Sequence, residues 1–117
     1  MDTTQRVVEI LTAALEGVPV STEVPERRPD RFVTVDLAGD YSTEFVKLPR
    51  YAITVWGRTD MDAHSMALSC LDALWLASED DDYLSACQLE TMSRDEWARD
   101  GQARYMLAVN LTFNTDE

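Results

Sequence analysis

The residue types that carry most enzyme chemistry are scarce in this chain, and their spacing does not suit catalysis. His64 is its single histidine, with Asp62 and Ser65 as close neighbours in sequence. On a helix, residues one or two apart point in different directions, so these three side chains cannot form a nucleophile–base–acid triad. We therefore expect His64 to be a surface or packing residue and the chain not to be an enzyme.

The two cysteines and the densest acidic run show no spacing typical of a metal site. Cys70 and Cys87 form no CxxC pair, and two cysteines are too few for a disulfide scaffold. Asp80–Asp82 lacks the alternating ligands, turn glycine and distal glutamate of a calcium loop. No glycine-rich phosphate loop follows a strand-like segment. We expect inert, buried thiols, no metal and no cofactor.

The chain is acidic, with 22 acidic and 10 basic side chains among 117 residues and a net charge of −12. Binding a nucleic-acid backbone requires clustered Lys and Arg, so the composition argues against it. Most of the acid follows residue 50, and half of the bases lie between residues 27 and 50: Arg27, Arg28, Arg31, Lys47 and Arg50. Such polarity suits contact between different surfaces of neighbouring copies, and it equally serves plain solubility.

Length and hydrophobic content are those of one folded domain, with 45% hydrophobic residues. The first 17 residues do not resemble a signal peptide, and no apolar run approaches a membrane span, so we expect a protein of a reducing cytoplasm. Apolar residues at helical spacing predict two helices, over 4–16 and 60–77. Alternating apolar residues predict strands over 18–24, 31–37, 51–57, 83–93 and 103–113.

Several features of these elements can be tested. Thr3 or Thr4 is expected to cap the first helix and Asp60 the second, and Gly17 suits a left-handed residue after the first helix. Pro19 limits the first strand to a sheet edge or a strand start. Acid is badly placed at the C-terminal end of a helix, so Glu79–Asp82 is assigned to the loop after the second helix.

The second predicted helix is apolar on more than one side. Its main stripe, which Met66 and Trp75 widen, is formed by Ala63, Ala67, Cys70, Leu71, Leu74 and Ser78. Leu68 and Leu76 fall outside this stripe. A helix of this kind is either deeply buried or in contact with a partner.

Residues 38–50 form an unusually apolar connection between two predicted strands, which we expect to pair antiparallel through it. It contains Tyr41, Phe45, Val46 and Leu48, and apolar groups in a long connection require a partner. Trp97 stands in a charged turn over 94–102. Tyr41, Phe45 and Trp97 suit a protein interface as well as local packing, whereas Trp56 and Trp75 are expected to complete the core.

The order α-β-β-β-α-β-β predicts an α+β single domain over residues 1–117. Its mostly antiparallel sheet of four to five strands would carry both helices on one face. The other face would be partly polar, and either exposed or in contact with a neighbouring subunit.

Four segments carry a family resemblance that extends over essentially the full chain. A short helix and a Val-rich strand (Val18–Val24) lead into VPERRPDRFVTVDLAGD, then LPRYAITVWGRTDMDAHSMA, and a closing strand introduced by Arg104 and Tyr105. This layout resembles the tail terminator proteins of siphophages, also called head-to-tail joining or tail completion proteins. Asp40 stands where relatives often have a second glycine, so the start of the connection departs from the family pattern.

The resemblance implies a structural virion protein of the head-proximal end of the tail, assembled in the host cytoplasm. Such subunits form a ring, commonly a homohexamer, that caps the tail tube and terminates its polymerisation. The ring also provides the docking surface for a head-completion or connector protein. DNA passes through the hole without specific binding, and an acidic lumen suits this because it repels phosphates.

Under this resemblance, two sets of residues become candidate sites. The candidate subunit interface comprises Tyr41, Phe45, Val46, Leu48, Arg27, Arg28, Arg50 and Trp97. The candidate lumen-facing acids are Glu79, Asp80, Asp81 and Asp82.

Three other functions remain open. A head-completion or other minor tail protein would act in the same virion at another place. The charge of −12 also suits an acidic DNA-mimic inhibitor, although the acids form no regular stripe. A small enzyme would require a pocket that combines His64 with a carboxylate of strongly shifted pKa.

Overall fold

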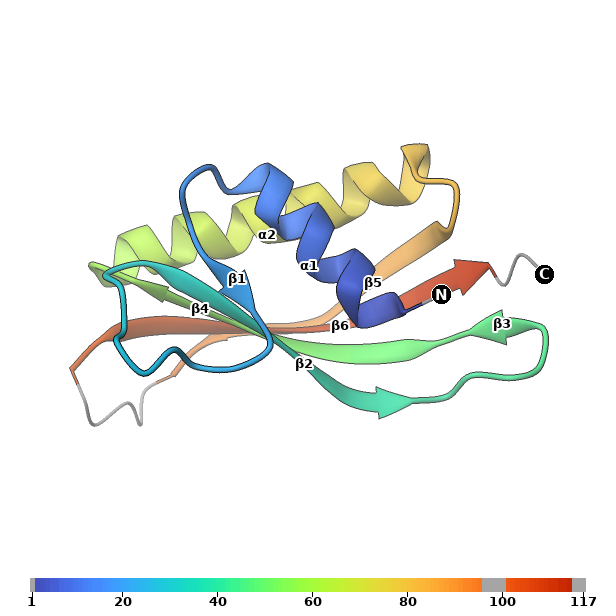
Figure 1. The fold of residues 1–117 in the computed structure, drawn as a ribbon, viewed down its shortest axis with the longest axis horizontal. Helices are drawn as coiled ribbons and strands as arrows, with labels where there is room; N and C mark the ends of the chain where they lie inside the picture. The colour runs from blue at the N-terminus through green and yellow to red at the C-terminus, as the bar shows by residue number, and fades with distance from the viewer. Residues whose placement is uncertain (1, 96–100, 115–117) are drawn as a thin grey trace.

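Two helices lie on one face of a six-stranded sheet in the computed structural model, which describes residues 2–95 and 101–114 (Figure 1). The predicted α+β class and the placement of both helices on one face are confirmed. The elements are α1 (Thr3–Ala14), β1 (Val20–Ser21), β2 (Phe32–Asp40), β3 (Val46–Lys47), β4 (Pro49–Gly57), α2 (Asp60–Asp80), β5 (Leu84–Arg94) and β6 (Ala103–Asn114). The strand beyond the predicted number is β3, which has two residues.

The sheet is mostly antiparallel, as predicted, with one parallel pair at its edge. β1 runs parallel to β2, and β2–β4, β4–β6, β5–β6 and β3–β6 are antiparallel. β3 and β4 keep one register along β6, with Val46 opposite Asn114 and Arg50 opposite Asn110. β5 occupies the other side of β6 over the same span. Residues 46–57 therefore form one long strand, interrupted at Leu48.

The core lies between the sheet and the helices. Alternate residues of β2, β4 and β6 point towards the helices, because side chains of a strand alternate between faces. Of the main-stripe residues of α2, only Ser78 is partly buried, and the others are buried: Ala63, Ala67, Cys70, Leu71 and Leu74. The buried residues of β6 are Leu107, Val109, Leu111 and Phe113. Val33 and Val35 are buried, whereas Leu37, further along the same strand, is half exposed and lies next to a register shift between Leu37 and Gly39.

The helix caps differ by one residue from the predictions. Asp2 caps α1 by accepting a hydrogen bond from the Gln5 amide (3.2 Å), and Thr59 caps α2 by accepting one from the Asp62 amide (3.0 Å). Thr3 and Thr4 place their hydroxyls 2.7 and 2.8 Å from the Tyr51 hydroxyl. The Tyr51 side chain is fully buried, and a buried hydroxyl requires hydrogen-bond partners. Both threonines therefore bind the Tyr51 hydroxyl and do not cap the helix.

Other ends of the elements were predicted with mixed success. Gly17 adopts a φ of 74° after α1, as expected. The predicted strand over 18–24 is only β1, which lies at a sheet edge as Pro19 required. Ser21 donates a hydrogen bond to the Glu23 carbonyl (2.7 Å), within the segment that leaves the strand. α2 continues to Asp80, so the assignment of the whole acidic block to a loop was wrong.

Candidate subunit interface

The connection over 38–50 is a continuation of two strands rather than a loop. Beyond β2, the Tyr41 amide donates to the Leu48 carbonyl (3.0 Å) and the Thr43 amide to the Val46 carbonyl (2.8 Å). The antiparallel pairing predicted for the two flanking strands is confirmed by β2 and β4, and it continues through the connection to a two-residue turn at Glu44 and Phe45. The ladder forms because it satisfies backbone groups that an open loop would leave to water. We call residues 39–49 the hairpin end.

Side-chain oxygens hold the turn of the hairpin end. The Thr43 hydroxyl oxygen accepts hydrogen bonds from the amides of Phe45 and Val46, both at 3.2 Å. Asp40 accepts hydrogen bonds from the hydroxyl and the amide of Ser42, and these bonds lower the pKa of the Asp40 carboxyl. Among the described residues only Gly17 and Gly101 have positive φ, so Asp40 occupies its place without needing a glycine.

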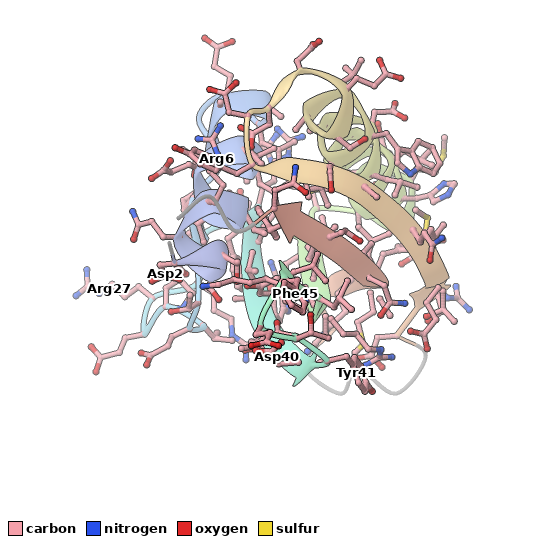
Figure 2. The ribbon with its side chains drawn as sticks, turned by 90° about the vertical axis from the view of Figure 1, so that its right-hand side faces the viewer. Asp2, Arg6, Arg27, Asp40, Tyr41 and Phe45 are labelled. Atoms are coloured by element: carbon pink, nitrogen blue, oxygen red, sulfur yellow. The ribbon has the colours of Figure 1, made fainter. Side chains whose placement is uncertain are left out.

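The aromatic residues of the hairpin end are exposed. Phe45 is 78% and Tyr41 67% exposed, and both lie at the end of the molecule that faces the viewer in Figure 2. Tyr41 lies next to Gly39, where an added Cβ would be 3.6 Å from Tyr41 Cε2 and 3.7 Å from Arg50 Cβ. Val46 and Leu48 are half-buried. Four of the predicted interface residues are therefore together on one projecting hairpin.

Arg50 is held beside this group by a bidentate ion pair. Its Nε and Nη2 atoms lie 2.7 and 3.1 Å from the two carboxylate oxygens of Glu90 on β5. Asn110 on β6 also donates to Glu90 (3.3 Å). The hydrogen bond from Arg50 lowers the pKa of Glu90, and Glu90 in turn raises the pKa of Arg50. Arg50 thus links three strands on the face without helices.

Arg27 and Arg28 do not join the hairpin end. They lie in the segment between β1 and β2, near the start of β2, whereas the hairpin end lies at the other end of β2 (Figure 1). The nine residues of β2 span roughly 27 Å, so the predicted interface residues form two separate groups. Trp97 lies outside the described residues.

Arginines from four segments gather where β2 begins, which we call the arginine-rich end. Two shallow cavities of about 300 and 340 Å³ flank Gln102, whose side-chain amide donates to the carbonyls of Pro29 and Asp30. The ion pairs here are Arg31–Asp62 (3.2 Å), Arg58–Asp30 (3.6 Å), Arg94–Asp60 (3.2 Å) and Arg104–Asp95 (3.7 Å). Each of these four arginines is thus paired with an aspartate.

The predicted core role of the tryptophans is confirmed for Trp56 and wrong for Trp75. Trp56 is 5% exposed, stacks on Phe32 with ring centroids 4.4 Å apart, and lies 5.4 Å from Arg104 Cζ. Trp75 lies on the outer side of α2 and is 44% exposed. Successive residues of an α-helix are rotated by about 100° around its axis, and this rotation places Trp75 outside the buried stripe of α2.

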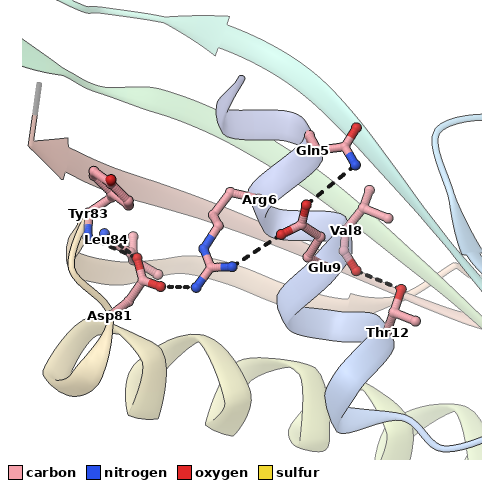
Figure 3. A network of polar contacts seen from close by, with 8 residues as sticks. All are labelled: Gln5, Arg6, Val8, Glu9, Thr12, Asp81, Tyr83 and Leu84. Atoms are coloured by element: carbon pink, nitrogen blue, oxygen red, sulfur yellow. Dashed lines mark hydrogen bonds and ion pairs between the residues drawn. The ribbon is translucent and has the colours of Figure 1, made fainter. Parts of the chain in front are cut away.

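The acidic block divides into a structural residue and three exposed ones. The Asp81 side chain is only 4% exposed and forms an ion pair with Arg6 of α1, which also pairs with Glu9 at 3.1 Å (Figure 3). Asp81 accepts further hydrogen bonds from the amides of Tyr83 (3.0 Å) and Leu84 (2.8 Å). Glu79, Asp80 and Asp82 are exposed.

This network explains why acid is tolerated at the end of α2. Burial raises the pKa of Asp81, but hydrogen bonds from Arg6 and from the Leu84 and Tyr83 amides outweigh burial and leave that pKa below its usual value. The Arg6 cation also lies where the negative end of the helix dipole needs a positive charge. Arg6 was not predicted as a site residue, although it is the first base in the chain and Arg27 is the next.

The residues considered for chemistry lie apart. His64 is exposed, with its ring centroid 5.0 Å from that of Tyr105. Both cysteines are free, and burial raises the pKa of Cys70 to about 12 and that of Cys87 to about 11. Within residues 2–95 and 101–114, no group of three or more His, Cys, Asp or Glu side chains can hold a metal ion. Neither described helix is long and apolar enough to span a membrane.

Comparison with known proteins adds no relative. No protein-family model matches this chain, and no curated protein matches it significantly.

Proposed function

We propose that this chain is a structural virion protein that caps a phage tail tube as a ring, terminates tube polymerisation and forms the head-docking surface. The proposal rests on the resemblance of the sequence to siphophage tail terminators and on one structural observation. That observation is the hairpin end, which extends the sheet beyond the helix layer and exposes Phe45 and Tyr41.

The exposed aromatic pair supports a contact with a neighbouring subunit. Large aromatic side chains on a rigid support are typical of binding hot spots, because they bury much area at little entropic cost. The ladder and the Thr43 turn provide that rigidity before any partner is bound. A hairpin contacting a different surface of the next copy is a heterologous contact, which closes into a ring when the rotation allows it.

The acidic charge supports passage of DNA without binding. Glu79, Asp80 and Asp82 are the exposed members of the acidic block, and carboxylates on the wall of the hole would repel phosphates. Asp81 makes a smaller contribution in this proposal, because its carboxylate is buried against Arg6.

Electron microscopy of the purified chain, alone and with assembling tail-tube protein, tests the proposal. We expect rings with a central hole, or tubes of limited length that carry a cap at one end. A chain that stays monomeric at every concentration and leaves tube length unchanged would contradict the proposal. Leaking heads with tails of normal length, in a phage lacking this protein, would instead indicate a head-completion protein.

A pair of substitutions tests the role of the hairpin end. Phe45→Asp places a charge on the projecting turn and is expected to abolish capping while the monomer stays folded. Leu76→Asp is the matched control, since Leu76 is also an exposed large apolar residue but lies on α2. Equal capping by both variants would show that the hairpin end is not the contact.

A further inference from the structure

Helix α2 carries charge of one sign only. Its 21 residues include five carboxylates and neither Lys nor Arg, and Asp81 and Asp82 follow directly. Two of the five, Asp60 and Asp62, form ion pairs with arginines at the start of the helix. The other three, Asp72, Glu79 and Asp80, are exposed. The remainder of the helix therefore presents an acidic outer surface.

Three large apolar side chains line this acidic surface at regular spacing. Met61, Leu68 and Trp75 are seven residues apart, which is close to two helical turns, and they are 85%, 44% and 44% exposed. We call this row the α2 stripe. At 1.5 Å per residue it extends for about 21 Å, the length of roughly four helical turns of a partner.

The α2 stripe borders the edge strand β5. α2 packs against β5, and among the described residues β5 pairs only with β6 (Figure 2). Leu89 lies opposite the buried Val109, so its partly exposed side chain is on the helix-covered face of the sheet. His64, one turn before Leu68, lies next to Tyr105 of β6. The apolar surface thus continues from the helix towards the strand.

Carboxylates accompany the stripe along its length. Asp72 and Glu79 follow Leu68 and Trp75 by four residues each, so each lies one turn further on the same side of the helix. We propose that the α2 stripe docks an amphipathic segment of a different protein, whose apolar side chains are flanked by Lys and Arg. This inference goes beyond the proposed function and does not depend on it.

Charge complementarity favours such a partner over a second copy of this chain. The bases that a second copy would bring are largely engaged: Arg6, Arg31, Arg50, Arg58, Arg94 and Arg104 each form an ion pair within the chain. A second copy would also add its own net charge of −12. A cationic partner gains attraction where a second copy meets repulsion.

Calorimetric titration with two synthetic peptides tests the proposal. One is an amphipathic helix of about 18 residues with leucines on one face and lysines on the other, and its counterpart carries glutamates in place of the lysines. The proteins are the wild type, the double variant Leu68→Ser/Trp75→Ser, and Leu37→Ser, which removes a half-exposed leucine of β2 as control. Circular dichroism verifies that each variant is folded.

We expect the lysine peptide to bind the wild type and Leu37→Ser with equal affinity. Its affinity for the double variant should be lower by a factor of about ten or more. The glutamate peptide should not bind. Asp72→Asn/Glu79→Gln should weaken binding of the lysine peptide and reduce its dependence on salt. The proposal is overturned if the lysine peptide does not bind the wild type. It is equally overturned if the double variant binds the lysine peptide with wild-type affinity, or if the wild type binds the glutamate peptide with the same affinity as the lysine peptide. It is also overturned if sedimentation shows that the double substitution converts a wild-type oligomer into monomers, since a second copy would then cover the stripe.

Discussion

The two ends of the sheet use similar residues for opposite purposes. At the hairpin end, Tyr41 and Phe45 are exposed on two strands that extend beyond the helices. At the arginine-rich end, Phe32 and Trp56 stack on each other beneath Arg104 and are almost fully buried. The difference lies in what covers them rather than in the residue types. Aromatic rings that the chain itself covers stabilise the fold, whereas rings left uncovered are available for contact.

The same contrast applies to the arginines. Arg50 is held beside the hairpin end by one bidentate pair with Glu90. At the other end, several arginines from distant segments alternate with aspartates around Gln102. The first arrangement positions a side chain, and the second joins segments that are remote in sequence.

The largest difference should appear when one aromatic residue is truncated at each end. Trp56→Ala removes a buried, stacked ring and is expected to lower the free energy of unfolding by about 3–5 kcal/mol. Phe45→Ala should change it by no more than about 0.5 kcal/mol, because that side chain is 78% exposed. Urea denaturation of both variants measures the two values. Similar losses would show that Phe45 is part of the folded core.

A second pair compares two strand glycines. A Cβ added at Gly57 would lie 2.6 Å from the backbone nitrogen of Ala63 in α2, whereas one at Gly39 meets only ordinary contacts from 3.6 Å. Gly57→Ala is therefore expected to cost about 1–3 kcal/mol, since the start of α2 must shift. Gly39→Ala should be neutral within about 0.5 kcal/mol. Thermal unfolding of both variants checks this order, and a stable Gly57→Ala variant would contradict the close approach.

The ion pair between Arg6 and Asp81 provides the most selective test, because its contribution to stability depends on pH. The pKa of Asp81 is lowered in the folded chain, so its carboxylate contributes stability above its unfolded value of 3.8, and this stability is lost as the pH falls through the folded value. Below about pH 4, wild-type stability should therefore fall more steeply than that of Asp81→Asn. Arg6→Ala should cost about 1.5–3 kcal/mol at neutral pH, with partial recovery in Arg6→Lys. If the stability of the wild type and of Asp81→Asn falls equally with pH, Asp81 is not the group responsible for the loss at low pH.

Much of the fold was predictable because local patterns and long-range packing agree. The alternation of Leu107, Val109, Leu111 and Phe113 predicted the buried face of β6, and the stripe from Ala63 to Leu74 predicted the core side of α2. The caps were less predictable, since Thr3 and Thr4 turn their hydroxyls to Tyr51, almost fifty residues away. Asp2 then takes the capping role.

The candidate interface was predictable only in part. An apolar segment at 38–50 could be recognised from composition alone, and four of its residues do lie together on the hairpin end. Arg27 and Arg28 joined the same candidate set because they belong to the basic minority of the first half of the chain, yet β2 separates them from the hairpin end. Trp75 was assigned to the core because it widens an apolar stripe, and the spacing could not show how far the sheet covers that side of α2.

The sequence by itself determined the fold class, the acidic character and the apolar nature of the hairpin end, because these depend on composition and on periodicity within one element. Tertiary structure decided which acids and bases meet. Asp81 is buried in an ion pair with Arg6 of α1, which lies seventy-five residues earlier in the chain. Asp82, one residue later, is exposed. Ion pairs and covered aromatic rings depend on distances between elements, and the chain sets those distances only when the core has packed.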